Sequence, residues 1–249
     1  MRNKFIFTLL FFTLQLQAKA WKLVWSDEFN YTGLPDSTKW RHETGNVRNN
    51  ELELYTFRRL KNSKVENGNL LITACKENYQ GANYTSARLS TDSLFNFTYG
   101  KIEARLKAPK GQGIWPAFWL LGQNINHVGS PQCGEIDIME HVKNENIIHS
   151  AMHWDKNGLI SFEGTKECDV QEFHIYTVEW NKNRIKWYLD GKKYLDGKIN
   201  AKKQNADEFR KPFYIILNLA VGGNWPGKPD DTTVFPAVMS IDYIRLYQK

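Results

Sequence analysis

Three acidic residues in the segment Gly134–His141 are the residues of this sequence best suited to carry out chemistry. Glu135 and Asp137 are two positions apart, so in a β-strand their side chains point to the same face of the sheet. Glu140 is five positions after Glu135 and would face the other side of a regular strand. A β-bulge at Ile138–Met139 absorbs one extra residue and returns Glu140 to the first face. The segment therefore predicts a bulged strand with three carboxylates on one face.

Carboxylates held this close cannot all stay ionised, because like charges raise one another's pKa. A pair of carboxyl groups can cleave a glycosidic bond: one attacks the anomeric carbon while the other, still protonated, donates to the leaving oxygen. The backbones of Glu135 and Glu140 would lie roughly 13 Å apart, and inward-leaning side chains suit either a retaining or an inverting separation. Asp137 lies between them and can keep their pKa values apart. A solvated edge strand and a calcium-binding cluster remain the alternatives.

The surrounding sequence has the two-residue periodicity of β-structure. Alternating polar and apolar residues, or a continuous apolar run, predict strands at Lys101–Lys107, His174–Trp180, Arg184–Leu189 and Phe213–Val221. Asp190-Gly191 is a strong signal for a two-residue hairpin turn. Only Ala201–Phe209 suggests a short helix. Many short strands separated by turn residues are typical of an all-β sandwich or barrel.

The first residues have the pattern of a signal peptide. A basic start at Arg2 is followed by the apolar run Phe5–Leu14 and by Ala18-Lys19-Ala20, the small-residue pattern of a cleavage site. The apolar run is shorter than the about 20 residues that cross a bilayer. We therefore expect residues 1–20 to direct the protein to secretion or to the periplasm. Residues 21–249 contain no repeat and no linker, which predicts a single domain.

Charge and cysteine content narrow the possible partners. Without residues 1–20, which contain three of the basic residues, the formal charge falls from +6 to +3. The remaining Lys and Arg form no basic stripe, so no nucleic-acid partner is expected. Cys75, Cys133 and Cys168 allow at most one intramolecular disulfide and lack metal-binding spacing. Nine tryptophans are many for one sandwich; they suit a buried core or flat platforms for sugar rings.

The acidic segment also resembles a known family. Glu-Ile-Asp-Ile-Met-Glu at 135–140 is similar to the catalytic signature of glycoside hydrolase family 16, in the bulged form typical of laminarinase-like members. Further ordered similarities extend over nearly the whole of residues 21–249, at Trp25–Phe29, Asn49–Leu52, Tyr84–Arg88, Gly113–Leu120, Asn218–Gly227 and Ile241–Arg245. The resemblance implies a jelly-roll β-sandwich of two antiparallel sheets with an open concave cleft for the substrate.

The resemblance also implies an activity and a set of site residues. It implies an endo-acting, retaining hydrolase of laminarin-type β-1,3-glucan, of mixed-linkage β-1,3/1,4-glucan, or of both. Glu135 would be the nucleophile, Glu140 the acid/base and Asp137 the assisting acid. The expected substrate contacts are sugar platforms at Trp115, Trp119 and Trp225, and hydrogen bonds from Asn49, Arg88 and His153. One departure is Asn46-Val47-Arg48, where many laminarinases have Gly-Trp-Gly, so the outer sugar contacts should differ.

Relatives of this kind often hold a structural calcium ion, which here would be bound by Glu28, the backbone of Gly68 and Asp242. Hard oxygen ligands suit Ca²⁺, and no cofactor is expected for catalysis. We expect a monomer that binds polysaccharide and does not insert into membranes. Two alternatives remain: a different specificity within the family, such as that of an agarase or carrageenase, and a non-catalytic β-glucan-binding protein.

Overall fold

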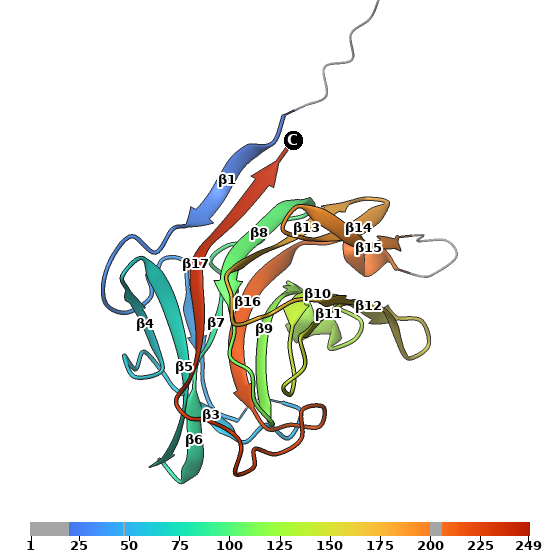
Figure 1. Cartoon of the computed structure of the whole chain (residues 1–249). Coiled ribbons are helices and arrows are strands. Elements are labelled where there is room, and N and C mark those ends of the chain that lie inside the picture. Colours follow the sequence, from blue (N-terminus) through green and yellow to red (C-terminus); the bar gives the residue numbers. More distant parts are fainter. Residues whose placement is uncertain (1–19, 47, 200–205) are drawn as a thin grey trace, which may run out of the picture.

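Two β-sheets packed face to face form the protein in a computed structural model, which describes residues 20–46, 48–199 and 206–249 (Figure 1). The first sheet has seven strands in the order β12-β11-β10-β9-β16-β7-β2. Their bounds are β2 Arg41–Glu43, β7 Arg88–Ser90, β9 Ile114–Gly122, β10 Glu135–Glu140, β11 Ile147–Asp155, β12 Leu159–Glu167 and β16 Phe213–Val221. This sheet carries the three acids on β10, an interior strand between β11 and β9.

The second sheet has ten strands within the described part of the chain. Its main order is β15-β14-β13-β8-β17-β5-β6-β3, with β1 paired to β17 and β4 to β5. The bounds are β1 Lys22–Asp27, β3 Glu53–Tyr55, β4 Ser63–Glu66, β5 Asn69–Tyr79, β6 Ala82–Ser86, β8 Gly100–Lys107, β13 His174–Asn181, β14 Arg184–Leu189, β15 Lys192–Lys198 and β17 Ala237–Gln248. The predicted jelly-roll sandwich is confirmed, with one departure from antiparallel pairing: β3 runs parallel to β6.

The strands predicted from periodicity are all present. In β8 the apolar residues Ile102, Ala104 and Leu106 are buried, while the charged residues between them are partly exposed. The Asp190-Gly191 turn joins β14 to β15, and both residues have positive φ, 48° and 74°, as a type I′ turn requires. The central strand β16 is buried on both faces along its whole length, as its apolar sequence predicts.

The prediction of a helix over Ala201–Phe209 is only partly testable, because 201–205 lie outside the described residues. The described portion contains a single 3₁₀ turn, Asp207–Arg210. The one-turn helix α1, Ile125–Val128, was not predicted from the sequence. Four residues are too few to show a helical period, so the hydrophobic pattern gave no signal.

The apolar core between the sheets takes up most of the tryptophans. Trp40, Trp154, Trp180 and Trp187 are buried in it, and Trp25 packs against its edge. Cys75, Cys133 and Cys168 are also buried, and each is a free thiol. The structure therefore contains no disulfide among the three.

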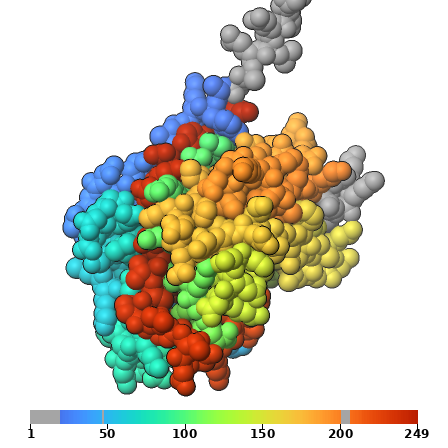
Figure 2. Space-filling view, in the orientation of Figure 1, coloured from blue at the N-terminus to red at the C-terminus, as the bar shows by residue number. Residues whose placement is uncertain are grey.

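The described ends of the chain lie side by side, because β1 pairs with β17 along the edge that is blue and red in Figures 1 and 2. The predicted signal peptide falls almost wholly on residues 1–19, outside the described part, and stays a prediction. Among the residues described, no helix has the length and apolar character needed to cross a membrane.

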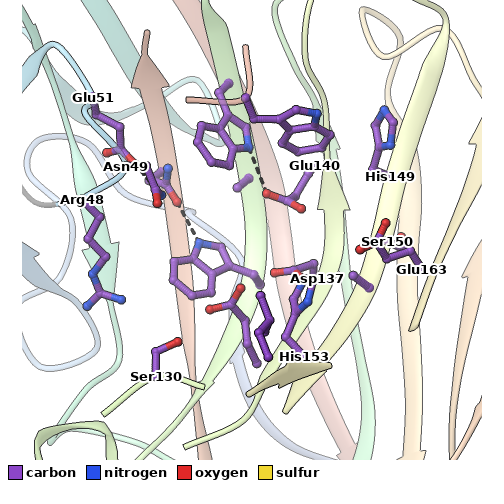
Figure 3. Close-up of a pocket in the computed structure, with 18 of the residues that line it drawn as sticks. Arg48, Asn49, Glu51, Ser130, Asp137, Glu140, His149, Ser150, His153 and Glu163 are labelled. Carbon is purple, nitrogen blue, oxygen red and sulfur yellow. Dashed lines mark hydrogen bonds and ion pairs between the residues drawn. The ribbon is translucent and has the colours of Figure 1, made fainter. Parts of the chain in front are cut away.

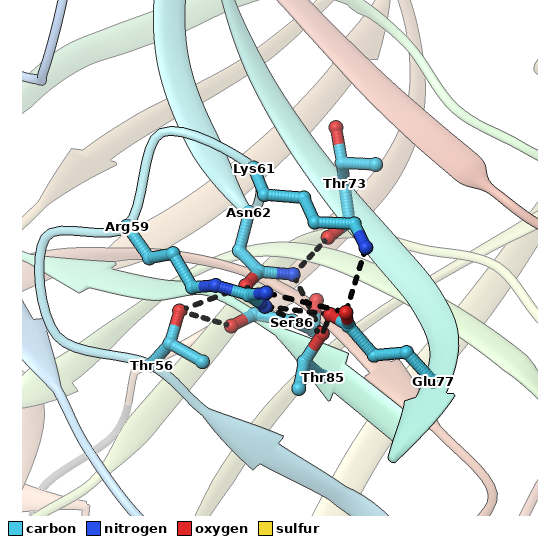
Figure 4. A network of polar contacts seen from close by, with 8 residues as sticks. All are labelled: Thr56, Arg59, Lys61, Asn62, Thr73, Glu77, Thr85 and Ser86. Atoms are coloured by element: carbon cyan, nitrogen blue, oxygen red, sulfur yellow. Dashed lines mark hydrogen bonds and ion pairs between the residues drawn. The ribbon is translucent and has the colours of Figure 1, made fainter. Parts of the chain in front are cut away.

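A polar network fastens the segment before β4 to strands β5 and β6 (Figure 4). Arg59 binds Glu77 through both guanidinium Nη atoms, at 2.6 and 3.2 Å, and Lys61 Nζ lies 2.6 Å from the same carboxylate. Thr85 Oγ1 of β6 also donates to Glu77. The Arg59 hydrogen bond, helped by those from Lys61 and Thr85, lowers the pKa of Glu77 to about 2. The network therefore stabilises β6 through an ionised carboxylate.

We expect Glu77→Gln to lower the free energy of unfolding by about 2 kcal/mol and Tm by ~4–8 °C at neutral pH. Because the folded pKa of Glu77 lies below its usual 4.5, this stabilisation is complete above about pH 4.5 and disappears as pH falls towards 2. Calorimetric melting of both proteins from pH 7 to pH 3 measures the difference. Glu167→Gln on exposed β12 is the control, and a pH-independent difference would contradict the electrostatic explanation.

Candidate active site

The predicted β-bulge in β10 is present. Asp137 pairs with Ala151 of β11 and Glu140 pairs with His149, so β10 advances three residues while β11 advances two. The pairing with β9 shifts at the same place. The side chains of Ile138 and Met139 are both buried in the core, 1% and 0% exposed. Two successive residues thus face inward, and Glu140 returns to the face of the other two acids.

A bulge interrupts the ladder of backbone hydrogen bonds, and side chains from other strands bind the carbonyl groups at this one. Trp187 of β14, in the opposite sheet, donates its indole N–H to the Asp137 carbonyl at 2.8 Å. Ser150 of β11 donates to the Ile138 carbonyl at 2.8 Å and is itself 2.6 Å from the Tyr194 hydroxyl. Buried backbone groups need such partners. These contacts hold in place the backbone of β10 that carries the three acids.

The three acids line a cleft of about 970 Å³ on the seven-stranded sheet. Figure 3 shows Arg48, Asn49 and Glu51 at one end of this cleft and His149 and Glu163 at the other. Asp137 and Glu140 lie between the two groups, with His153 beside Asp137. The predicted concave cleft and its acidic centre are therefore brought together by the fold.

Glu140 is placed so that it holds a proton. Burial, reinforced by the negative charges of Asp137 and Glu135, raises the pKa of Glu140 well above its usual value. The indole N–H of Trp115 donates to Glu140 Oε1 at 2.9 Å and opposes that rise only in part. A neutral carboxylic acid in a cleft can donate its proton to a leaving group.

Glu135 has a different electrostatic environment. Burial and the charge of Asp137 raise the pKa of Glu135 to about 7, but the cations His153, Arg48 and Arg88 limit the rise. Glu140 has no comparable cation among the causes of its shift. The two glutamates therefore differ in pKa, and Glu135 is the one that ionises more readily near neutral pH. Two carboxyl groups separated in this way suit a nucleophile and an acid.

His153 pairs with Asp137. The sequence predicted a substrate contact for His153 but not this ion pair. Its Nε2 lies 3.0 Å from Asp137 Oδ2, and its Nδ1 lies 2.6 Å from Ser161 Oγ. Burial disfavours the imidazolium, but the hydrogen bond and charge of Asp137 outweigh it and raise the pKa of His153 to about 9. His153 is thus a cation near neutral pH. It is neither a core histidine nor simply a substrate ligand.

The charge of His153 predicts a change in the pH dependence of activity. We expect His153→Gln to raise the pKa of Glu135, because a cation that favours the carboxylate is removed. In the predicted mechanism the Glu135 carboxylate attacks, so the acidic limb of kcat/KM against pH should move upward by ~1 unit. The control is His174→Gln, which changes a histidine of β13 that is paired with Asp190 of the turn after β14. An unmoved acidic limb would contradict the role given to His153.

The three tryptophans predicted to contact sugars all line the cleft. Trp225 is 40% exposed and meets Trp115 edge to face at 5.5 Å. Trp119 is only 8% exposed and packs in a second, smaller apolar cluster on this side of the sheet. Its indole N–H donates to Asn218 Oδ1 at 2.8 Å. Trp115 and Trp225 therefore offer the broader surfaces, and Trp119 forms part of the floor.

The predicted hydrogen-bonding residues Asn49 and Arg88 also line the cleft. Arg88 is 3% exposed, binds Glu43 at 2.8 Å, and places its guanidinium 4.8 Å from the Trp119 ring centre. Asn49 donates to Glu51 at 3.2 Å. Asn49 and Asn50 both have φ of 56°, a left-handed conformation that asparagine tolerates better than most residues.

Several cleft residues were missed by sequence reasoning, and most lie on strands whose pattern already pointed to them. His149 is four positions before His153 on β11, so the strand period of two places it on the same face as the residue that the resemblance implied. Glu163 lies opposite Ala151 on the neighbouring strand β12. Arg48, noted only as a departure from the laminarinase pattern, lines the cleft and acts electrostatically on Glu135.

Neither possible metal site has a donor set that is available to a cation. Oxygen and nitrogen atoms of Glu135, Asp137 and His153 lie within 4.8 Å of one another, but His153 already pairs with Asp137 and imidazole is a poor ligand for Ca²⁺. At the predicted calcium site, Arg245 binds both carboxylate oxygens of Glu28, at 2.9 and 2.7 Å. Arg105 binds Asp242 at 2.7 Å. Both carboxylates are thus already paired with arginines, which leaves them less suited to a calcium ion. The calcium ion stays a prediction.

Comparison with known proteins gives consistent results. The family described as "Glycosyl hydrolases family 16" matches residues 37–245. The chain is 40% identical over 248 residues to a "Beta-glucanase" of Rhodothermus marinus, covering 93% of this chain and 87% of that protein. It is 42% identical over 235 residues to the "Clotting factor G alpha subunit" of Tachypleus tridentatus, covering 92% of this chain but only 34% of that longer protein.

Solved structures include close counterparts of the whole fold. The laminarinase catalytic domain from Thermotoga maritima MSB8 superposes with a TM-score of 0.83 at 41% sequence identity. The superposition covers 93% of this chain and 99% of that domain. The chain is therefore similar to this domain both in sequence and in fold over nearly its full length.

Proposed function

The chain belongs to glycosyl hydrolases family 16, and from this premise we propose that it is an endo-acting β-glucanase that works with retention of configuration. The observation that carries the proposal is the bulged strand β10, which presents Glu135, Asp137 and Glu140 to one cleft. The different charges around Glu135 and Glu140 supply the two protonation states that the reaction needs.

In the first step, Glu140 donates its proton to the glycosidic oxygen while the Glu135 carboxylate attacks the anomeric carbon. The C–O bond to the departing sugar breaks, and an ester bond between Glu135 and the remaining glycosyl unit forms. Asp137, paired with His153, lies between the two glutamates. It holds His153 as a cation, which in turn favours the ionised Glu135.

In the second step, Glu140 is a carboxylate and takes a proton from a water molecule, which attacks the same anomeric carbon and releases Glu135. The negative charge of Glu140 repels the other carboxylates less once Glu135 is esterified, so its pKa falls after the first step. One residue can then act first as an acid and next as a base.

The proposed substrates are laminarin-type β-1,3-glucan and mixed-linkage β-1,3/1,4-glucan. Proteins named "Glucan endo-1,3-beta-glucosidase" and "Endo-1,3-1,4-beta-glycanase" are both similar to this chain, at 38% and 32% identity. The exposed Trp225 and the Trp115 beside it line the cleft and offer flat apolar surfaces for sugar rings.

Product analysis on laminarin, mixed-linkage glucan and agarose tests the proposal. Oligosaccharides from one or both glucans, and none from agarose, are the expected result. If configuration is retained, the first product is the β-anomer. NMR spectra recorded before mutarotation identify it. Products from agarose alone would replace the substrate assignment. Binding without cleavage of any polymer would replace the hydrolase with a glucan-binding protein.

Three further properties are proposed on the basis of the sequence. We propose that residues 1–20 are removed on export, that the protein is secreted or periplasmic, and that it acts as a monomer without a nucleic-acid partner. N-terminal sequencing of the exported protein and light scattering test these points. Thermal unfolding with added Ca²⁺ or a chelator tests the structural calcium ion.

A further inference from the structure

A second hollow lies next to the cleft and shares one wall residue with it. This side pocket has a volume of about 410 Å³, within the ~300–1,000 Å³ usual for small-ligand sites. Glu51 lines both the side pocket and the catalytic cleft. In Figure 3, Glu51 lies at the end of the cleft, beside Asn49 and away from Glu163. A polymer that extends past this end of the cleft would pass Glu51 and its neighbours.

The lining of the side pocket has the chemistry of a sugar site. Three amide side chains line it, Asn46, Gln80 and Asn83, together with the ring of Tyr84 and the aliphatic Leu54. Amides both donate and accept hydrogen bonds, as sugar hydroxyl groups require. The Tyr84 ring is held in place by Phe235, at 5.3 Å between ring centres. No basic residue lines the pocket, which disfavours an anionic ligand.

The backbone around the side pocket is firmly held. Gln80 and Gly81 form the two-residue turn between β5 and β6 and have φ of 51° and 83°. The next strand, β6, pairs with both β5 and β3 and is anchored through Thr85 to the Glu77 network (Figure 4). A pocket wall built on paired strands is preorganised for binding.

The shared residue Glu51 is oriented by two hydrogen bonds. Asn49 Nδ2 donates to its Oε1 and the Tyr55 hydroxyl donates to its Oε2, each at 3.2 Å. The Tyr55 hydroxyl accepts from Asn218 at 3.3 Å, and Asn218 accepts from Trp119. A continuous chain of polar contacts therefore joins Glu51 to the floor of the catalytic cleft.

The neighbouring acid Glu53 is buried and interacts with Glu51. Glu53 is 0% exposed, and its Oε2 accepts the backbone N–H of Val221 at 2.7 Å. Burial and the charge of Glu51 raise the pKa of Glu53 well above its usual value. Glu53 therefore favours its neutral form, and Glu51 is the acid of this pair that lines the side pocket. Carboxyl oxygens accept hydrogen bonds from the hydroxyl groups of a sugar.

We propose that the side pocket binds one further glucosyl residue of the substrate, with the Glu51 carboxylate as the acceptor shared between pocket and cleft. The inference rests on the proposed function, since it assumes a glucan in the cleft. The glucosyl residue has two possible sources: the continuation of the main chain beyond the cleft, or a branch attached to it. In both cases the group that occupies the side pocket is a glucosyl ring.

Binding and turnover by pocket variants test the inference. The variants are Asn83→Ala and Gln80→Gly, the second keeping the positive φ that glycine tolerates. The matched control is Gln171→Ala, an exposed glutamine before β13 that lines neither pocket. Melting temperatures check that each variant is folded. The ligands are linear β-1,3-gluco-oligosaccharides of increasing length and a β-1,6-branched laminarin. Calorimetric titration is carried out in the Glu135→Gln background, so that the ligands are not cleaved during the measurement.

We expect the pocket variants, and not Gln171→Ala, to bind extended ligands about fivefold more weakly, as the loss of one hydrogen bond predicts. In the otherwise unchanged enzyme, KM should rise by the same factor with kcat unchanged. Weaker binding of long linear ligands identifies the main chain, and weaker binding of branched laminarin alone identifies the branch. If the parent and the variants bind every ligand equally well, the proposal that the side pocket binds a glucosyl residue is overturned. Failure of the parent to bind or cleave any β-glucan overturns the proposed function instead.

Discussion

Glu135→Gln is expected to lower kcat on β-1,3-glucan by ~10⁴-fold or more, because the amide cannot form the covalent intermediate. The substitution keeps the size of the side chain, so the fold and the binding of oligosaccharides should persist. Hydrolysis measured by reducing ends, together with calorimetric titration of a laminari-oligosaccharide, separates the loss of chemistry from the loss of binding. Unchanged affinity with abolished turnover is the result that the mechanism requires.

The matched control is Glu163→Gln, which removes a carboxylate from the same cleft but from the exposed strand β12. This variant should retain turnover of the same order as the unmodified enzyme. A kcat for Glu135→Gln within about tenfold of the unmodified value would contradict its role as nucleophile. Loss of activity in both variants would show that the net charge of the cleft, rather than one residue, is what matters.

Glu140→Gln is expected to lower kcat on natural glucans by about 10²–10⁴-fold, the usual contribution of a general acid. The amide oxygen can still accept the Trp115 indole N–H that now reaches Glu140 Oε1. The variant should therefore keep the local structure while losing the proton donor. Its pH profile should also lose the basic limb, because no acid remains to be deprotonated there.

The leaving group provides the decisive comparison for Glu140. A nitrophenyl β-gluco-oligosaccharide releases nitrophenolate, a stable anion that needs no protonation. The first step on this substrate should therefore be nearly as fast in Glu140→Gln as in the unmodified enzyme. The covalent intermediate should then accumulate, since no base activates the water of the second step. Mass spectrometry detects that adduct. Equal losses on both kinds of substrate, with no adduct, would contradict the acid/base role.

The position of the acids depends on a backbone irregularity that is supported from both sheets. In a regular strand without the bulge, Glu140 would face the core on the side of Ile136 and Ile138. Trp187 reaches the Asp137 carbonyl from the opposite sheet, and Ser150 reaches the Ile138 carbonyl from the adjacent strand. Support from outside β10 explains how an enzyme site can be both irregular and rigid.

The sequence alone determined those features that depend on near neighbours in the chain. The alternation of Lys101–Lys107 predicted β8, and the Asp190-Gly191 turn predicted the β14–β15 hairpin. The number of residues between Glu135 and Glu140 predicted the bulge, because a strand has a strict period of two. Each inference needs only local stereochemistry and the contrast between polar and apolar side chains.

The tertiary structure alone decided which partner each side chain meets. It buried Trp154 and Trp187 in the core while leaving Trp225 in the cleft. It paired His153 with Asp137, and it placed arginines against the carboxylates of Glu28 and Asp242. These contacts join residues far apart in the chain, and strand order and register set them. The pKa values that divide the two glutamates into nucleophile and acid depend on the same long-range packing, because burial and neighbouring charge, rather than residue type, set them.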